Sequence, residues 1–125
     1  AIAVISEKDI ESKVPVLKVS NSIKALGKIA NWYRKSLDIR VIGITGSNGK
    51  TTTKNMLNNI LSQSSSTFAT LGNLNNHIGV PLSLLSLTDS HNYAVIEMGA
   101  NHVGEIDYLR EIAWLQRRDK QTNLT

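Results

Sequence analysis

Cysteine is absent from this 125-residue chain, and aromatic side chains make up only 5% of it. Without cysteine there can be no disulfide, thiolate metal site or cysteine nucleophile, which fits a reducing compartment, and we expect the cytoplasm. No apolar run approaches the roughly 20 residues that cross a bilayer, and the first ten residues lack a basic and apolar leader. We therefore expect neither a secretory signal nor membrane insertion.

The charge balance is basic, with a formal net charge of +4 and a sequence pI of about 9.5. A nucleic-acid partner would favour a dense basic patch with aromatic residues between the charges. The only dense cluster is "RRDK" at Arg117–Lys120, and aromatic residues are scarce. We therefore interpret the charge as a solvated surface that also suits a small anionic ligand, and we expect no nucleic acid and no obligate protein partner.

The first part of the chain predicts two strands and a helix. The stretches 1–6 and 14–20 are short, β-branched and apolar, which is typical of strands. From Asn21 to Leu37 apolar residues recur at helical spacing, and Ser20 or Asn21 can cap the amino end. The pattern changes at Asp38–Arg40, which we take as a domain boundary. We expect one part over 1–38, a second part over 39–113 and a divergent polar tail over 114–125.

From residue 40 onward, strands and helices alternate, which predicts an α/β fold with a parallel sheet and right-handed crossovers. Expected strands cover 37–45, 67–71 and 93–99; expected helices cover 51–62, 81–87 and 102–113, with an irregular Asn- and Gly-rich loop over 72–81. In the last helix Val103, Ile106, Leu109 and Ile112 are expected to face the sheet. No further apolar strand follows "WLQRRDKQTNLT", so the sheet looks incomplete.

The stretch "GITGSNGKTTTKN" has the parts of a phosphate-binding loop. Gly46 and Gly49 allow backbone N–H groups to approach oxygens, Lys50 can meet phosphate charge, and the Thr51 hydroxyl can bind Mg²⁺. A glycine-rich turn between a strand and a helix is the simpler alternative, and Ile44 stands where the general pattern has glycine. Three threonines are poor openers of a helix, which makes sense if their hydroxyls bind metal or phosphate.

The acidic partner of that loop is predicted at Glu97, which follows four apolar residues at the end of a buried strand. In parallel sheets the ligand crevice lies at the carboxyl ends of the strands, so Glu97 is placed to hold Mg²⁺. The asparagines of the 72–81 loop suit turns as well as ligand recognition. His77 and His102 have no second histidine at ligand spacing, so a zinc site is not expected, and His91 is interpreted as a solvated loop residue.

Three stretches together resemble the Mur ligases: "GITGSNGKTTTKNML", "LGNLNNHIGVPLSLLSL" and "YAVIEMGANHVGEIDYL". That family tolerates a residue other than glycine where Ile44 stands. The resemblance implies that residues 1–38 are the end of a UDP-substrate-binding domain and that 39–113 are the first part of a P-loop-type central ATPase domain, incomplete here, with ATP and Mg²⁺ as cofactors. The last two stretches are most similar to the member that adds D-alanyl-D-alanine to UDP-N-acetylmuramoyl-tripeptide through an acyl phosphate, in peptidoglycan synthesis.

The resemblance also implies roles for individual residues. Lys50 and Glu97 would be catalytic, and Thr51 and Glu97 would hold the metal. The nucleotide phosphates would be bound by the loop residues Gly46, Ser47, Asn48, Gly49, Lys50, Thr51 and Thr52. Nucleotide or peptide substrate would be contacted by Asn73, Asn76, Asn101 and His102.

Three interpretations of the whole chain follow. In the first, the chain is a piece of such a ligase and does not ligate alone, because the family's later metal-site residues and dipeptide-binding domain have no counterpart here. In the second, the chain is a stand-alone nucleotide-binding module without ligase activity. In the third, the incomplete sheet leaves a fragment that binds nothing well and is prone to association.

Overall fold

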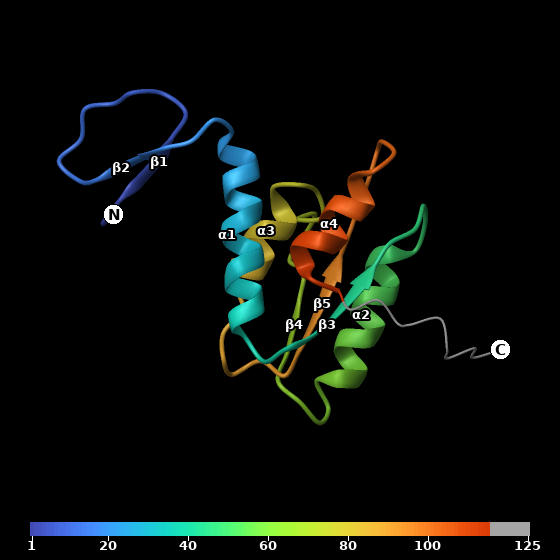
Figure 1. Cartoon of the computed structure of the whole chain (residues 1–125). Helices are drawn as coiled ribbons and strands as arrows, with labels where there is room; N and C mark the ends of the chain where they lie inside the picture. The colour runs from blue at the N-terminus through green and yellow to red at the C-terminus, as the bar shows by residue number, and fades with distance from the viewer. Residues whose placement is uncertain (116–125) are drawn as a thin grey trace.

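A computed structural model describes residues 1–115 (Figure 1). None of the helices in this part is long and apolar enough to cross a membrane. The elements run in the order β1 (Val4–Ser6), β2 (Val16–Lys18), α1 (Ser22–Ser36), β3 (Arg40–Ile44), α2 (Lys50–Leu61), β4 (Thr67–Ala69), α3 (Gly79–Leu85), β5 (Tyr93–Glu97) and α4 (Glu105–Ala113).

The central sheet has the strand order β3-β5-β4, and both pairings are parallel. This confirms the predicted α/β fold with a parallel sheet and flanking helices. The register pairs Ile44 at the end of β3 with Glu97 at the end of β5. The glycine loop, which follows Ile44, therefore starts beside the predicted acidic residue.

Helices cover both faces of this sheet (Figure 1). One face is covered by α2, while α3 and α4 pack on the other and α1 packs outside them. The apolar core lies on the side of α1, α3 and α4 and includes no residue of α2. The α2 residues Met56 and Ile60 are exposed, and Lys54 is the buried residue of this helix. Leu57 and Leu61 of α2 are half-buried, so this helix packs on the sheet with both apolar side chains and the buried Lys54.

The five strands are shorter than predicted, and two helices start two or three residues away from their predicted positions. The last helix begins at Glu105 instead of residue 102, because Gly104 adopts a left-handed conformation (φ 89°) just before it. Val103 is consequently fully exposed and does not face the sheet, whereas Leu109 and Ile112 are buried as predicted.

Helix α3 also starts earlier than predicted, inside the stretch 72–81 that we expected to be irregular. The side-chain oxygen of Asn76 accepts hydrogen bonds from the backbone N–H groups of Ile78 and Gly79, at 3.1 and 2.8 Å. These bonds satisfy two donors at the start of the helix. Gly79 also lies so close to the Leu74 backbone that a Cβ there would clash with it.

The N-terminal part forms a two-stranded parallel sheet of β1 and β2 that is linked to α1. The Glu7 carboxylate accepts hydrogen bonds from the backbone N–H and the hydroxyl of Ser22, at 2.7 and 2.8 Å. Of the two predicted capping residues, Asn21 caps α1, since its side chain accepts from the N–H of Lys24 at 3.0 Å. The proposed domain boundary at 38–40 stays a prediction, and residues 116–125 of the predicted tail lie outside the described residues.

Candidate functional site

The glycine loop connects the end of β3 to the start of α2 and takes the backbone conformations that glycine allows. Gly46 has φ 145° and Gly49 has φ 77°, both in a region that other residues rarely adopt. Lys50 opens α2, and its ammonium donates a hydrogen bond to the carbonyl of Gly46 at 2.7 Å. The lysine thus folds back over the loop, next to the positive end of a helix of 12 residues. This combination suits an anion.

Glu97 lies at the same edge of the sheet and is 3% exposed. The Thr51 hydroxyl donates to its Oε2 at 3.3 Å, although the two residues are 46 positions apart in the sequence. The structure thus brings together the two residues that we predicted as metal ligands. A threonine hydroxyl and a carboxylate are the hard oxygen ligands that Mg²⁺ takes when phosphates and water complete its shell, so this donor set fits the ion.

Three further side chains surround Glu97, and none of them was among the predicted catalytic or metal residues. Asn75 donates its side-chain N–H to Glu97 Oε1 at 3.1 Å. The Lys54 ammonium lies 3.5 Å from Oε2, and the Thr70 hydroxyl accepts the backbone N–H of Glu97 at 2.9 Å. One sequence signal could have identified Lys54: it lies three residues after Thr51 and so shares its helix face.

A cavity of about 570 Å³ opens beside the loop. Its lining includes Lys50 together with Asn76, Asn101 and His102, so three of the four predicted substrate residues meet one predicted phosphate residue there. Asn73 is exposed and is not part of this lining. Among the described residues, no group of three or more histidine or acidic side chains is placed to hold a metal by itself.

The loop that carries Asn101 and His102 is fixed by Glu105. The backbone N–H groups of Asn101 and His102 donate to Glu105 Oε2 at 2.6 and 3.1 Å. These two bonds, followed by the nearby charges of His102 and His77, lower the pKa of the Glu105 carboxyl. The carboxylate therefore stays ionised at neutral pH and holds the loop against the start of α4.

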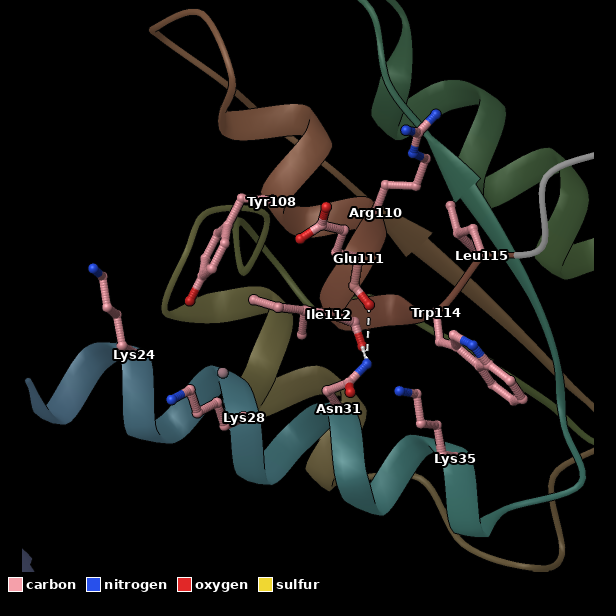
Figure 2. Close-up of a pocket in the computed structure, with 11 residues that line it drawn as sticks. Lys24, Lys28, Asn31, Lys35, Tyr108, Arg110, Glu111, Ile112, Trp114 and Leu115 are labelled. Atoms are coloured by element: carbon pink, nitrogen blue, oxygen red, sulfur yellow. Dashed lines mark hydrogen bonds between the residues drawn. The ribbon is translucent and has the colours of Figure 1, made fainter. Parts of the chain in front are cut away.

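A second cavity, of about 680 Å³, lies between α1 and α4, on the helical side of the molecule (Figure 2). Lys24, Lys28 and Lys35 project from α1 along it, and the Trp114 ring closes one end. Asn31 bridges the two helices by donating to the carbonyls of Glu111 and Ile112, at 2.9 and 3.0 Å. None of the predicted site residues lines this cavity.

Comparison with known proteins places the site in a family. The family model described as "Mur ligase middle domain" matches residues 44–116. A relative from Escherichia coli, UDP-N-acetylmuramoyl-tripeptide--D-alanyl-D-alanine ligase, is 48% identical over 104 residues, which cover 83% of this chain and 23% of the relative. The same ligase from Bacillus subtilis is 46% identical over 98 residues, or 78% of this chain and 21% of the relative.

Solved structures agree. MurF from Acinetobacter baumannii superposes with a TM-score of 0.83 at 46% identity, covering 90% of this chain and 25% of that one. The MurF ligase from Thermotoga maritima in complex with ADP superposes with a TM-score of 0.83 at 38% identity, covering 90% and 26%. The chain therefore spans about a quarter of the length of the ligases it matches.

Proposed function

The chain belongs to the Mur ligase family, and on that premise we propose that it carries the phosphate-binding part of an ATP-dependent peptide ligase. The proposed enzyme adds D-alanyl-D-alanine to UDP-N-acetylmuramoyl-tripeptide, the reaction named for the relatives. The observation that carries this proposal is the meeting of Lys50, Thr51 and Glu97 at one edge of the sheet. Because that reaction consumes ATP and builds a peptidoglycan precursor, we propose the cytoplasm as its location.

The proposed chemistry is phosphoryl transfer followed by amide formation. The substrate carboxylate attacks the γ-phosphate of ATP and releases ADP, and the amine of the dipeptide then displaces phosphate from the acyl phosphate. The loop residues Gly46–Thr52 bind the phosphates through backbone N–H groups, and Lys50 neutralises charge on the transferred group. Thr51 and Glu97 would hold Mg²⁺, which supplies positive charge at the phosphate oxygens.

We propose that the peptide substrate approaches through the 570 Å³ cavity. Asn101 and His102 line it beside Lys50, which supports a role in contacting the UDP-muramoyl peptide. Asn76 also lines it, but its side-chain oxygen is occupied by the start of α3. We therefore assign Asn76 a positioning role toward the nucleotide or substrate. Asn73 is exposed and lies outside the cavity lining, and we propose that it contacts the nucleotide or substrate from there.

Ligation is proposed to need residues that the 125-residue chain does not supply, since it spans about a quarter of the relatives' length. A stand-alone nucleotide-binding module remains the second candidate, favoured by a phosphate loop that is formed within this part alone. The two candidates share nucleotide binding and differ in ligation. Detectable dipeptide ligation by the purified 125-residue chain would contradict the need for further residues.

Isothermal titration calorimetry with ADP and Mg²⁺ tests the shared step. We expect saturable binding to the wild-type chain and at least tenfold weaker binding to Lys50→Ala, because the loop then loses the cation that lies over it. Lys28→Ala is the matched control, since this exposed lysine lies on α1 away from the loop. Equal affinity of the wild type and Lys50→Ala, in chains that circular dichroism shows to be folded, would refute the proposal.

A further inference from the structure

Lys54 is a charged side chain in a place where helices normally bury apolar residues. It is 5% exposed and lies on α2, whose apolar residues Met56 and Ile60 are exposed. Lysine is almost never fully buried unless it is paired, and removing an ammonium group from water costs several kcal/mol in general. A buried lysine one turn after the phosphate loop therefore needs a reason beyond helix formation.

Lys54, Thr70 and Glu97 contact one another in a closed network at the carboxyl end of the sheet. Its ammonium donates to the carbonyl of Thr70 at 2.9 Å and lies 3.5 Å from Glu97 Oε2. The network closes because the Thr70 hydroxyl accepts the backbone N–H of Glu97 at 2.9 Å. One side chain thus ties α2, the residue that follows β4 and the last residue of β5 together.

The same network defines the direction of the Glu97 carboxylate. Oε1 is held by Asn75, while Oε2 faces both the Thr51 hydroxyl and the Lys54 ammonium. In the described part of the chain, Lys54 is the one Lys or Arg that forms an ion pair with Glu97. Without it, a carboxylate that is 3% exposed would have no paired cation and would turn toward other donors.

We propose that Lys54 is a positioning residue for the nucleotide site, which aligns the Glu97 carboxylate and the phosphate-loop helix before a magnesium–nucleotide complex binds. This inference rests on the proposed nucleotide binding and adds to it a side chain that touches neither phosphate nor metal in the proposed arrangement. Lys54 acts through Glu97, so its removal should affect the part of the affinity that depends on Mg²⁺ and spare the rest.

The test measures ADP affinity by calorimetry in Mg²⁺ and in EDTA, for the wild type, Lys54→Met and Lys54→Gln. We expect the gain in affinity from Mg²⁺ to fall at least tenfold in both variants, with the affinity in EDTA changed less than threefold. Lys28→Met on α1 is the control and should keep the full gain. A folded Lys54 variant with a gain equal to or larger than that of the wild type would overturn the proposal, since the ammonium would then only repel the ion.

A second measurement needs no nucleotide. Urea unfolding of the wild type, Lys54→Gln, Glu97→Gln and the double variant gives the coupling between the two residues. We expect the double variant to be more stable than the sum of the single effects predicts, by at least tenfold in the unfolding equilibrium constant. Additive effects would overturn the proposal. If the wild type does not bind ADP, the proposed function fails, and this coupling still decides whether Lys54 holds Glu97.

Discussion

Replacing Gly49 by alanine tests whether the phosphate loop is formed without nucleotide. Gly49 has φ 77° and ψ 7°, and a Cβ built there has no heavy atom within 4 Å. The cost of the substitution is therefore conformational: about 1–2 kcal/mol for an L-residue in the left-handed region. Alanine recovers roughly 0.4–1 kcal/mol by restricting the unfolded chain. The expected net loss is about 1 kcal/mol, or roughly fivefold in the unfolding equilibrium constant.

Urea unfolding at equilibrium measures this loss. We expect the free energy of unfolding to fall with urea concentration at the same slope as in the wild type. Gly104→Ala is the matched control, because Gly104 has φ 89°, equally open surroundings and a place just before a different helix. We expect both alanine variants to lose about the same stability, but only Gly49→Ala to bind ADP more weakly. Gly49→Asn should lose less, since asparagine tolerates this conformation.

The reasoning fails if Gly49→Ala is as stable as the wild type while Gly104→Ala loses the expected amount. Position 49 would then be free to leave the left-handed conformation, and the loop would not be formed before nucleotide binds. A loss of several kcal/mol in Gly49→Ala would also contradict it, because the open surroundings leave no steric clash to cause one.

Two predictions concern the scaffold around the site. Glu105 should titrate below its usual pKa of 4.5, because the N–H groups of Asn101 and His102 stabilise the carboxylate. Its contribution to the stability of the fold is therefore complete above pH 4.5. That contribution is lost as the pH falls through the lowered pKa of the folded protein. Carboxyl-resolved NMR titration checks this, and a pKa at or above 4.5 would mean that the loop bonds are not formed. Leu84→Ala should destabilise the chain by about 2–5 kcal/mol in urea unfolding, because Leu84 is fully buried. Leu82→Ala on the same helix should cost much less, since Leu82 is 43% exposed. Equal losses would contradict the packing of α3, because both side chains would then be equally buried.

The placement of the glycine loop beside Glu97 was predictable because it follows from local patterns and one topological rule, while the phosphate and metal roles of these residues stay predictions. A strand precedes the loop and another ends at Glu97, and parallel strands place their carboxyl ends at one edge. The pairing of Ile44 with Glu97 and the 3.3 Å contact from Thr51 to Glu97 are consequences of that rule. Asn21 as a cap was similarly local, since it needs only the first turn of α1.

The spacing from Thr51 places Lys54 on the same helix face, but its burial could not be predicted from sequence, because it depends on partners from β5 and from the end of β4. A lysine in a helix is usually interpreted as solvated, and only the folded structure shows that this one is buried against the sheet. The start of α4 was missed for a different reason: Gly104 was counted as part of the helix, while its left-handed conformation ends the preceding turn. Val103 was then assigned to the wrong face.

The most direct measurement follows the backbone amide signals of the ¹⁵N-labelled chain while ADP and Mg²⁺ are added. If the loop of residues 43–52 binds the phosphates, the largest shifts will fall on Gly46, Gly49, Lys50 and Thr51, with smaller shifts at Glu97. Shifts centred instead on the cavity between α1 and α4, or no shifts in a chain whose spectrum is that of a folded protein, would contradict the account.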